Sequence, residues 1–323
     1  MAQDADPQLQ PHLARIAALV ANAPGTPLEK RRAASLALSS YVDDNTLPTL
    51  RAPRTATKDG AVSARGRRIG TRTYIPEDGP GGDLTLLYFH GGGWVSGNLE
   101  SHDDLLRRVA HMLGCTLIAV DYRLAPEHAM PAALEDAAEV LGHLRENLKG
   151  RPGARFALGG DSSGAHIAAV TANTIAPDAA GLLLFYPVVR PHFTTRSYIE
   201  RCNSNLTVGM MKWFWEQYLG MGIEGDKLDT PDARIDLLQQ KWHRAPPPAV
   251  VLTAWHDPLC DEGSAYARHL AEAGGEVRLT CANGMPHGFA RFCGINATAE
   301  RHIAQAVRDF AGLVQADSMA SAR

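Results

Sequence analysis

The chain of 323 residues is 45% hydrophobic and 21% charged, with a formal net charge of −3 at pH 7. This composition is typical of a globular α/β core and lacks the basic field with which proteins bind nucleic acids or anionic membranes. No apolar stretch is long enough to cross a bilayer, and the first residues lack the basic and apolar regions of a secretory signal. We therefore expect a cytoplasmic protein without stable membrane association.

Five cysteines are scattered along the chain without CxxC spacing, which indicates reduced thiols and not a disulfide framework or a zinc site. Neither an H-E-x-x-H motif nor a carboxylate cluster at metal spacing occurs, so the sequence predicts no metal and no organic cofactor. Arg65, Arg67 and Arg68 form a short basic run, which we interpret as a solvated loop.

Residues 8–22 and 28–42 carry apolar residues at helical spacing and precede the first recognisable strand. They predict an N-terminal helical appendage. From Leu84 onward, short apolar runs alternate with helical stretches. The apolar runs predict buried strands at residues 84–89, 115–120, 154–158, 181–187, 249–254 and 276–281. The stretches between and after them predict helices near residues 101–113, 131–147, 163–175, 262–273 and 297–315.

This alternation predicts an α/β fold with a mostly parallel central sheet flanked by helices. Ligands of such sheets bind at the carboxyl ends of the strands. Residues 190–245 interrupt the alternation and contain the aromatic-rich stretch LTVGMMKWFWEQYLG. That stretch predicts a helix that packs on the core, a lid over the site, or a helix that does both.

The motif HGGGW, residues 90–94, directly follows the strand predicted at 84–89. Three consecutive glycines leave backbone N–H groups uncovered and allow them to approach a ligand. Acyl-transfer enzymes need such donors to stabilise the oxyanion, and an HGGG loop accompanies the serine elbow of α/β-hydrolases. A phosphate-binding loop is the alternative, but neither a P-loop lysine nor a G-x-G-x-x-G frame follows.

Gly160, Ser162 and Gly164 fit the pattern G-x-S-x-G between a predicted strand and a predicted helix. A sharp turn at this place exposes the serine hydroxyl at a fixed angle and requires small neighbours. Ser162 is therefore the predicted nucleophile. The predicted oxyanion donors are the amides of Gly92, Gly93 and Ser163.

An acid and a base are expected to follow the nucleophile in that order along the chain. Asp257 follows the strand at 249–254, and Pro258 ends that strand, so the carboxylate can accept the imidazole N–H of the base. Asp261 is the competing acid, for which helix capping is the alternative role. His287 follows the last predicted strand on a loop, whereas His269 and the other later histidines lie at less suitable places.

With these motifs, the chain resembles the hormone-sensitive-lipase-like branch of the α/β-hydrolases, which includes bacterial carboxylesterases. The resemblance runs from about Leu84 to the last helix. It rests on HGGGW (90–94), DYRLAPEH (121–128) with PAALEDA (131–137), GDSSG (160–164), DPLCDEG (257–263) and HGF (287–289). The resemblance implies Ser162 as nucleophile, Asp257 as acid, His287 as base, and Gly92, Gly93 and Ser163 as oxyanion donors.

The chain departs from the family pattern at Ser163 and Ala165, where alanine and glycine are usual, and at Trp255 and His256 before the acid. These departures bear on substrate range more than on mechanism. The resemblance also implies a catalytic core of residues 51–189 and 246–323 under a cap of residues 1–50 and 190–245. The residues expected to contact the substrate are Trp94, Trp213 and Trp255. Many relatives pair into dimers, so a homodimer is a further expectation.

These residues predict ester hydrolysis through an acyl-enzyme, in which His287 takes the proton of Ser162. A cap rich in aromatic residues favours short- to medium-chain acyl groups, so the expected partner is a small-molecule ester. Amidase, lactonase and carbamate hydrolase activities use the same triad and stay open. A ligand-binding receptor on the same fold is the alternative from another class, but receptors of this family lose a triad member and all three positions are filled here.

Overall fold

The structure is a computed structural model that describes residues 5–77, 82–202 and 205–321. A central sheet of eight strands has the order β1-β2-β4-β3-β5-β6-β7-β8. All neighbours from β4 to β8 in that order pair in parallel, as the alternating pattern predicted. The parallel strands are β3 (Leu84–Phe89), β4 (Thr116–Asp121), β5 (Arg155–Asp161), β6 (Leu182–Phe185), β7 (Ala249–His256) and β8 (Val277–Pro286).

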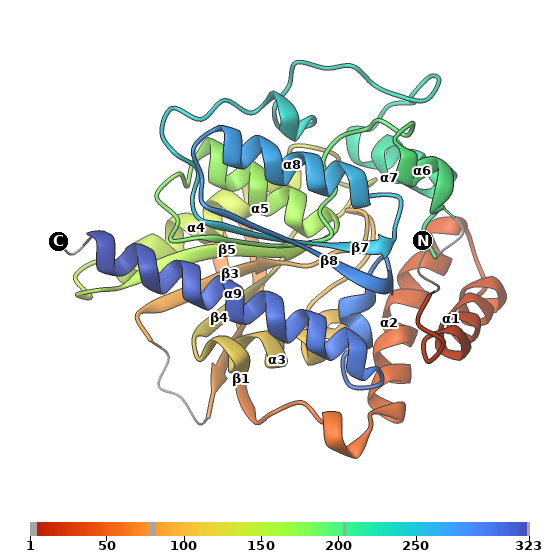
Figure 1. Ribbon diagram of the computed structural model, residues 1–323, viewed down its shortest axis with the longest axis horizontal. Helices are drawn as coiled ribbons and strands as arrows, with labels where there is room; N and C mark the ends of the chain where they lie inside the picture. Colours follow the sequence, from red (N-terminus) through yellow and green to blue (C-terminus); the bar gives the residue numbers. More distant parts are fainter. Residues whose placement is uncertain (1–4, 78–81, 203–204, 322–323) are drawn as a thin grey trace.

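Helices cover both faces of the sheet (Figure 1). One face carries α4 (Ala132–Leu148), α5 (Ser163–Thr174) and α8 (Cys260–Glu272), and the other carries α3 (Asp103–Leu113) and α9 (Ala297–Ser321). Short 3-10 turns lie at Pro48–Leu50, Glu100–His102, Leu237–Gln239 (η3) and Phe289–Phe292 (η4). No helix in the described part of the chain is both long and apolar enough to cross a bilayer.

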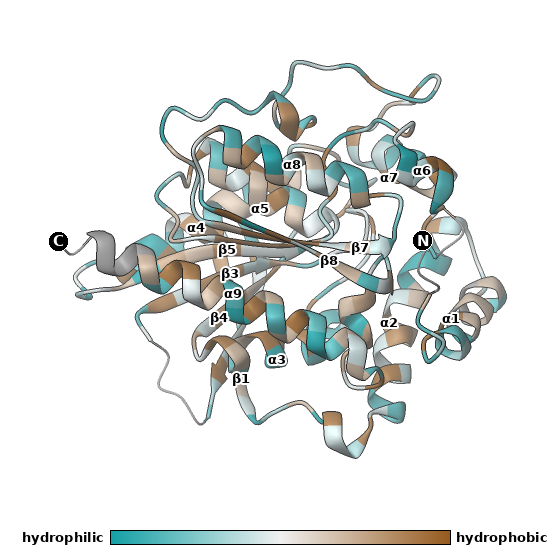
Figure 2. Ribbon diagram, viewed as in Figure 1, coloured by the Kyte–Doolittle hydropathy of each residue, from teal (hydrophilic) through white to brown (hydrophobic). Residues whose placement is uncertain are grey.

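Alternate side chains of each central strand enter opposite layers of the core. On β3, Leu87 and Phe89 pack in the layer under α4 and α5, whereas Leu86 and Tyr88 pack in the layer under α3 and α9. All four side chains are fully buried. A strand buried on both faces is apolar along its whole length, which is why the apolar runs located these strands and why the sheet is brown in Figure 2.

An antiparallel hairpin, β1 (Thr55–Ala64) and β2 (Arg67–Pro76), extends the sheet and pairs with β4. The apolar pattern of the sequence does not predict this hairpin. Most β1 side chains are exposed at this edge of the sheet, so the segment contains no continuous apolar run. The interpretation of the arginine run as a solvated loop holds for Arg65, which lies exposed in the turn between the two strands, but it was wrong for Arg67. Arg67 opens β2 and donates a hydrogen bond to buried Asp136 on α4 (2.8 Å).

The N-terminal helices α1 (Gln10–Asn22) and α2 (Pro27–Asn45) lie next to α6 (Arg196–Glu200) and α7 (Val208–Leu219), beyond the carboxyl ends of β7 and β8 (Figure 1). Helix α2 begins at a capping box in which Thr26 and Glu29 bond each other's backbone amides. The two segments assigned to a cap are therefore far apart in sequence and adjacent in space.

Candidate active site

The turn between β5 and α5 holds a serine in a strained backbone conformation. Ser162 has φ 54° and ψ −122°, a conformation that costs a residue with a side chain about 1–3 kcal/mol. The flanking glycines make the turn possible. A Cβ on Gly160 would overlap the backbone of Gly164, and a Cβ on Gly164 would overlap the carbonyl of Phe89. The turn thus directs the Ser162 side chain into a cavity.

Ser162, His287 and Asp257 form one line of hydrogen bonds. The Ser162 hydroxyl lies 2.9 Å from His287 Nε2, and His287 Nδ1 lies 2.7 Å from Asp257 Oδ2. Because a carboxylate only accepts hydrogen bonds, Nδ1 carries the proton and Nε2 accepts the hydroxyl proton. Asp257 is fully buried, and its Oδ1 accepts a hydrogen bond from the amide of Leu259 (2.9 Å), which holds the carboxylate in place.

Sheet register brings the acid and the imidazole together. His256 at the end of β7 pairs with Pro286 at the end of β8, so the next residue of each strand, Asp257 and His287, lies beside the other. The register shift that allows this pairing lies between Ala254 and His256, and strand irregularities of this kind often aim side chains at active sites. Strand β8 is longer than predicted and reaches the residue before His287.

The competing acid, Asp261, is engaged elsewhere. Its Oδ2 accepts a hydrogen bond from the amide of Ser197 at the start of α6 (2.8 Å). Asp261 lies in the first turn of α8 and therefore ties that helix to the 190–245 insertion.

Gly92 and Gly93 of the HGGGW loop line the same cavity as Ser162. Ser163 is the first residue of α5, so its amide is one of the N-terminal donors that have no acceptor inside the helix. The side chain of Ser163 ties the two motifs together, because its Oγ accepts a hydrogen bond from the amide of Trp94 (3.2 Å). All three predicted oxyanion donors therefore belong to segments that meet at Ser162.

Asp161 provides a second tie beside the elbow. Its Oδ1 accepts hydrogen bonds from the amide of Gly91 (3.0 Å) and the hydroxyl of Tyr88 (3.2 Å). Burial alone would raise the pKa of this carboxyl, but the nearby His102, His90 and Arg291 outweigh it and keep the pKa below its ordinary value. Asp161 is therefore ionised, and its charge is compensated inside the protein.

The sequence of residues 86–291 matches a family described as having the α/β-hydrolase fold. The chain belongs to the hormone-sensitive-lipase-like α/β-hydrolases. It is 36% identical over 253 residues to ethyl acetate hydrolase of Pseudomonas putida (75% of this chain, 78% of that protein). It is 35% identical over 261 residues to carboxylesterase NlhH of Mycobacterium tuberculosis (76% and 77%).

A solved structure, a hyperthermophilic esterase from the archaeon Pyrobaculum calidifontis, superposes on this α/β-hydrolase with a TM-score of 0.82 and 31% identity. The match covers 96% of this chain and 98% of that one. The similarity therefore includes the N-terminal helices and the insertion as well as the sheet.

The cavity above Ser162 has a volume of 390 Å³. The loop of residues 91–93 and the elbow form one side, and α1, α2 and α7 form the other. Its apolar wall includes Leu13, Ala17, Leu38, Leu206, Met210, Met211 and Phe214. Two arginines, Arg31 of α2 and Arg291 of η4, also line it. No sequence pattern distinguished these two from solvated arginines.

The three tryptophans expected to contact the substrate are not among the described residues that line this cavity. Trp94 is 1% exposed and stacks on Tyr218 with ring centroids 4.2 Å apart. Trp255 lies under the guanidinium of Arg201, 3.9 Å from its carbon. Their expected role in binding is therefore not supported by their positions.

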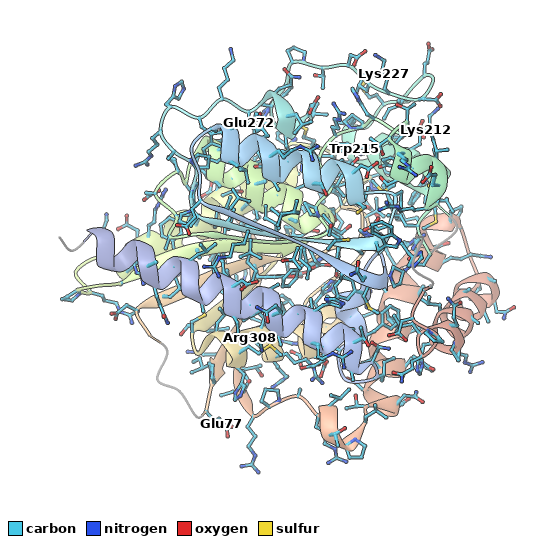
Figure 3. All side chains as sticks on the ribbon, in the orientation of Figure 1. Glu77, Lys212, Trp215, Lys227, Glu272 and Arg308 are labelled. Carbon is cyan, nitrogen blue, oxygen red and sulfur yellow. The ribbon has the colours of Figure 1, made fainter. Side chains whose placement is uncertain are left out.

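The orientation of α7 explains why Trp213 is not among the described residues that line the cavity. Residues 210, 211 and 214 share the side of the helix that faces the cavity, whereas Trp213 lies beside Phe214 and outside the cavity lining. Two other side chains of α7, labelled in Figure 3, have different surroundings. Trp215 is fully buried, and Lys212 donates a hydrogen bond to the carbonyl of Gly225 (3.2 Å). How α7 packs on the rest of the protein decides which of its faces meets the cavity. This packing could not be predicted from the sequence.

Proposed function

We propose that this α/β-hydrolase is a carboxylesterase that hydrolyses short- to medium-chain esters of small molecules. The observation that carries the proposal is the pair of hydrogen bonds from Ser162 to His287 (2.9 Å) and from His287 to Asp257 (2.7 Å), at a strained elbow facing two cavity-lining glycines. The esterase names of its relatives support the same activity. The proposal includes the assignment of residues 1–50 and 190–245 to a cap over the active site.

In the first half of the reaction, Ser162 Oγ attacks the ester carbonyl while His287 Nε2 takes its proton. The carbonyl oxygen becomes an oxyanion and accepts hydrogen bonds from the amides of Gly92, Gly93 and Ser163. Asp257 stabilises the imidazolium that forms. Collapse of the intermediate breaks the bond to the alcohol, which leaves with the proton from Nε2, and the acyl group stays on Ser162.

In the second half, water replaces the alcohol. His287 takes a proton from the water as it attacks the acyl-enzyme, and the same amides bind the new oxyanion. Expulsion of Ser162 Oγ, which recovers its proton from Nε2, releases the carboxylic acid. The proposed sequence consumes one water per ester and needs no metal or cofactor.

The size of the cavity supports short and medium acyl chains. Small-molecule sites span about 300–1,000 Å³, and the cavity of 390 Å³ lies near the lower end of that range. Side chains of α1, α2 and α7 form much of the cavity wall, so the space beside Ser162 leaves little room for a long acyl chain. We therefore expect a steep fall in turnover from p-nitrophenyl butyrate to p-nitrophenyl palmitate.

A fluorophosphonate tests the nucleophile directly. Intact-mass measurement should show one adduct on the native chain, mapped to Ser162, and none on Ser162→Ala. We expect Ser162→Ala to lose at least about 10⁴-fold in kcat on p-nitrophenyl butyrate, because the covalent route is removed. Ser63→Ala, at an exposed position of β1, is the matched control and should keep full activity.

Residual Ser162→Ala activity within tenfold of the native protein would contradict the proposal. Faster hydrolysis of palmitate than of butyrate would contradict its chain-length part. The matching p-nitroanilide, assayed in parallel, separates esterase from amidase activity, since the proposal expects the ester to be cleaved faster.

A further inference from the structure

Two guanidinium groups, those of Arg31 and Arg291, line the cavity of a protein whose formal net charge is −3. Within the described residues, neither forms an ion pair with a carboxylate. Their neighbour Arg32 behaves differently, because Glu127 accepts hydrogen bonds from both of its terminal nitrogens (2.8 and 2.7 Å). The cavity therefore contains two arginines without carboxylate partners.

Arg291 has a structural function that accounts for its charge. Its Nη2 donates hydrogen bonds to the carbonyl of Ser35 (2.6 Å) and the hydroxyl of Ser39 (3.4 Å), which ties α2 to the segment after His287. Burial lowers the pKa of Arg291 to about 10, with Asp161 opposing the shift. Arg291 therefore has hydrogen-bond acceptors on α2 for its guanidinium and the charge of Asp161 to oppose the effect of burial, and we assign it a structural role.

Among the residues that the structure describes, Arg31 has no oxygen acceptor of this kind. Its Nη2 lies 3.5 Å from the thioether sulfur of Met210, and its guanidinium carbon lies 5.2 Å from the ring centroid of Phe214. A thioether is a weak acceptor and a phenyl ring offers only a cation–π contact, whereas a guanidinium has five N–H donors. Burial lowers the pKa of Arg31, and no described carboxylate offsets that effect. Its charge is the uncompensated one in the cavity.

Phe214 relates Arg31 to the reacting bond. The ring of Phe214 lies against Gly93 so closely that a Cβ on that glycine would overlap it. The guanidinium of Arg31 lies over the same ring, so Phe214 contacts both Gly93 and Arg31. A substrate whose carbonyl oxygen is bound by the Gly93 amide can therefore extend along Phe214 and reach Arg31 with a short chain.

We propose that Arg31 binds a carboxylate carried by the substrate, so that the preferred substrates are esters with a second, ionised carboxyl group a few carbons from the ester bond, such as monoesters of dicarboxylic acids. This inference rests on the proposed function. A guanidinium and a carboxylate form strong, charge-assisted hydrogen bonds in a partly enclosed site. A neutral ester of equal length leaves the guanidinium unpaired and is disfavoured for that reason. The second carboxylate takes no part in the bond changes.

The test compares the monoethyl ester of adipic acid with the corresponding ester-amide, in which an uncharged carboxamide replaces the carboxylate. We expect the native protein to have a kcat/KM about 10- to 100-fold higher for the anionic ester, the range of one hydrogen-bonded charge pair. The succinate and glutarate monoesters locate the best chain length. Added NaCl should reduce the preference, because it screens the ion pair.

Arg31→Met should reduce that ratio to about one, mainly through KM of the anionic ester, because Arg31 lies away from the reacting atoms. Arg31→Lys should keep part of the preference, since it retains the charge and loses the paired donors. Arg15→Met is the matched control: Arg15 is exposed on α1 and does not line the cavity, so its replacement should leave the ratio at the native value.

Two failures are distinguishable. If the native protein hydrolyses both esters with a ratio near or below one, the assignment of Arg31 is wrong, whether or not the variants fold, and the proposed esterase function stands. A preference that survives Arg31→Met also contradicts it. If neither ester is hydrolysed and a fluorophosphonate does not label Ser162, the proposed function is wrong and the inference falls with it.

Discussion

The two sides of the cavity are built in different ways. The elbow at residues 160–164 and the loop at 90–94 present backbone amides and one strained serine, and several Cβ positions there are already filled by neighbouring backbone. The opposite side presents side chains from α2 and α7, among them Phe214 and Arg31. The glycines of the first side therefore cannot carry a side chain without moving their neighbours, whereas the second side can change its lining without changing the fold. Under the proposed function, the first side carries the nucleophile and the oxyanion donors, and the second side decides which substrates fit.

Asp257→Asn tests most severely the hydrogen bonds that connect Ser162, on the first side, to His287 and Asp257. An asparagine that presents its amide to His287 Nδ1 favours the wrong tautomer, so we expect kcat on p-nitrophenyl butyrate to fall by about 10⁴-fold while the fold is kept. Asp261→Asn is the control, because that carboxylate bonds the amide of Ser197 and not His287. A larger loss in Asp261→Asn than in Asp257→Asn would show that the acid has been assigned to the wrong residue.

Gly164→Ala tests whether the elbow tolerates a single methyl group. The new Cβ would overlap the carbonyl of Phe89, so we expect the free energy of unfolding to fall by about 3 kcal/mol in urea denaturation. Gly142→Ala on α4 is the matched control, since a Cβ there meets open space and should stabilise the helix by about 0.5–1 kcal/mol. If the two variants were equally stable, the elbow would tolerate a side chain at position 164. The first side of the cavity would then be no more constrained in sequence than the second.

The same distinction explains what could be predicted from the sequence. The motifs G-x-S-x-G and HGGG contain glycines that a particular backbone geometry requires. The motifs alone therefore locate the turn and the loop in the sequence. Strands buried on both faces are apolar throughout, so their ends, and with them Ser162, Asp257 and His287, could be placed in order along the chain. The structure brings these three side chains into hydrogen-bond contact, while their catalytic roles stay predictions.

The side-chain wall and the sheet edge could not be placed in this way. Which face of α7 meets the cavity is decided by docking, so the sequence favoured Trp213 over Phe214. Hairpin β1–β2 has one edge strand with mostly exposed side chains, and its pattern does not differ from that of a polar loop. Arg31 could not be singled out from the sequence, because what distinguishes it is the absence of a described carboxylate near its guanidinium. That absence is known only from the structure.

Acid should weaken the packing between the two sides through His166. This residue is fully buried on α5 with its ring edge-on to Trp94 (5.3 Å) and Trp215 (5.4 Å), and burial lowers its pKa to about 4. An unfolded chain binds a proton on this imidazole near pH 6.5. The stability contributed by neutral His166 is therefore complete above about pH 6.5 and is lost towards pH 4, by up to about 1.4 kcal/mol per pH unit.

Urea unfolding at pH 7.0 and pH 5.0 measures this dependence. We expect His166→Gln to reduce the loss of stability between the two pH values, because the variant has no proton to gain there on unfolding. His143→Gln, at an exposed position of α4, should leave the loss unchanged. An unchanged pH dependence in His166→Gln would mean that other buried groups carry it.

Phe214→Ala is the mildest test and addresses the second side. Removing the ring enlarges the cavity beside Gly93, so we expect the ratio of kcat/KM for p-nitrophenyl octanoate over butyrate to rise about fivefold, within the range that one hydrophobic pocket can discriminate. Trp213→Ala removes a larger ring one residue earlier on the same helix and should leave the ratio unchanged, because Trp213 does not line the cavity. If Trp213→Ala shifts the ratio and Phe214→Ala does not, Trp213 contacts the substrate, as the sequence predicted. In that case α7 must rotate when the substrate binds.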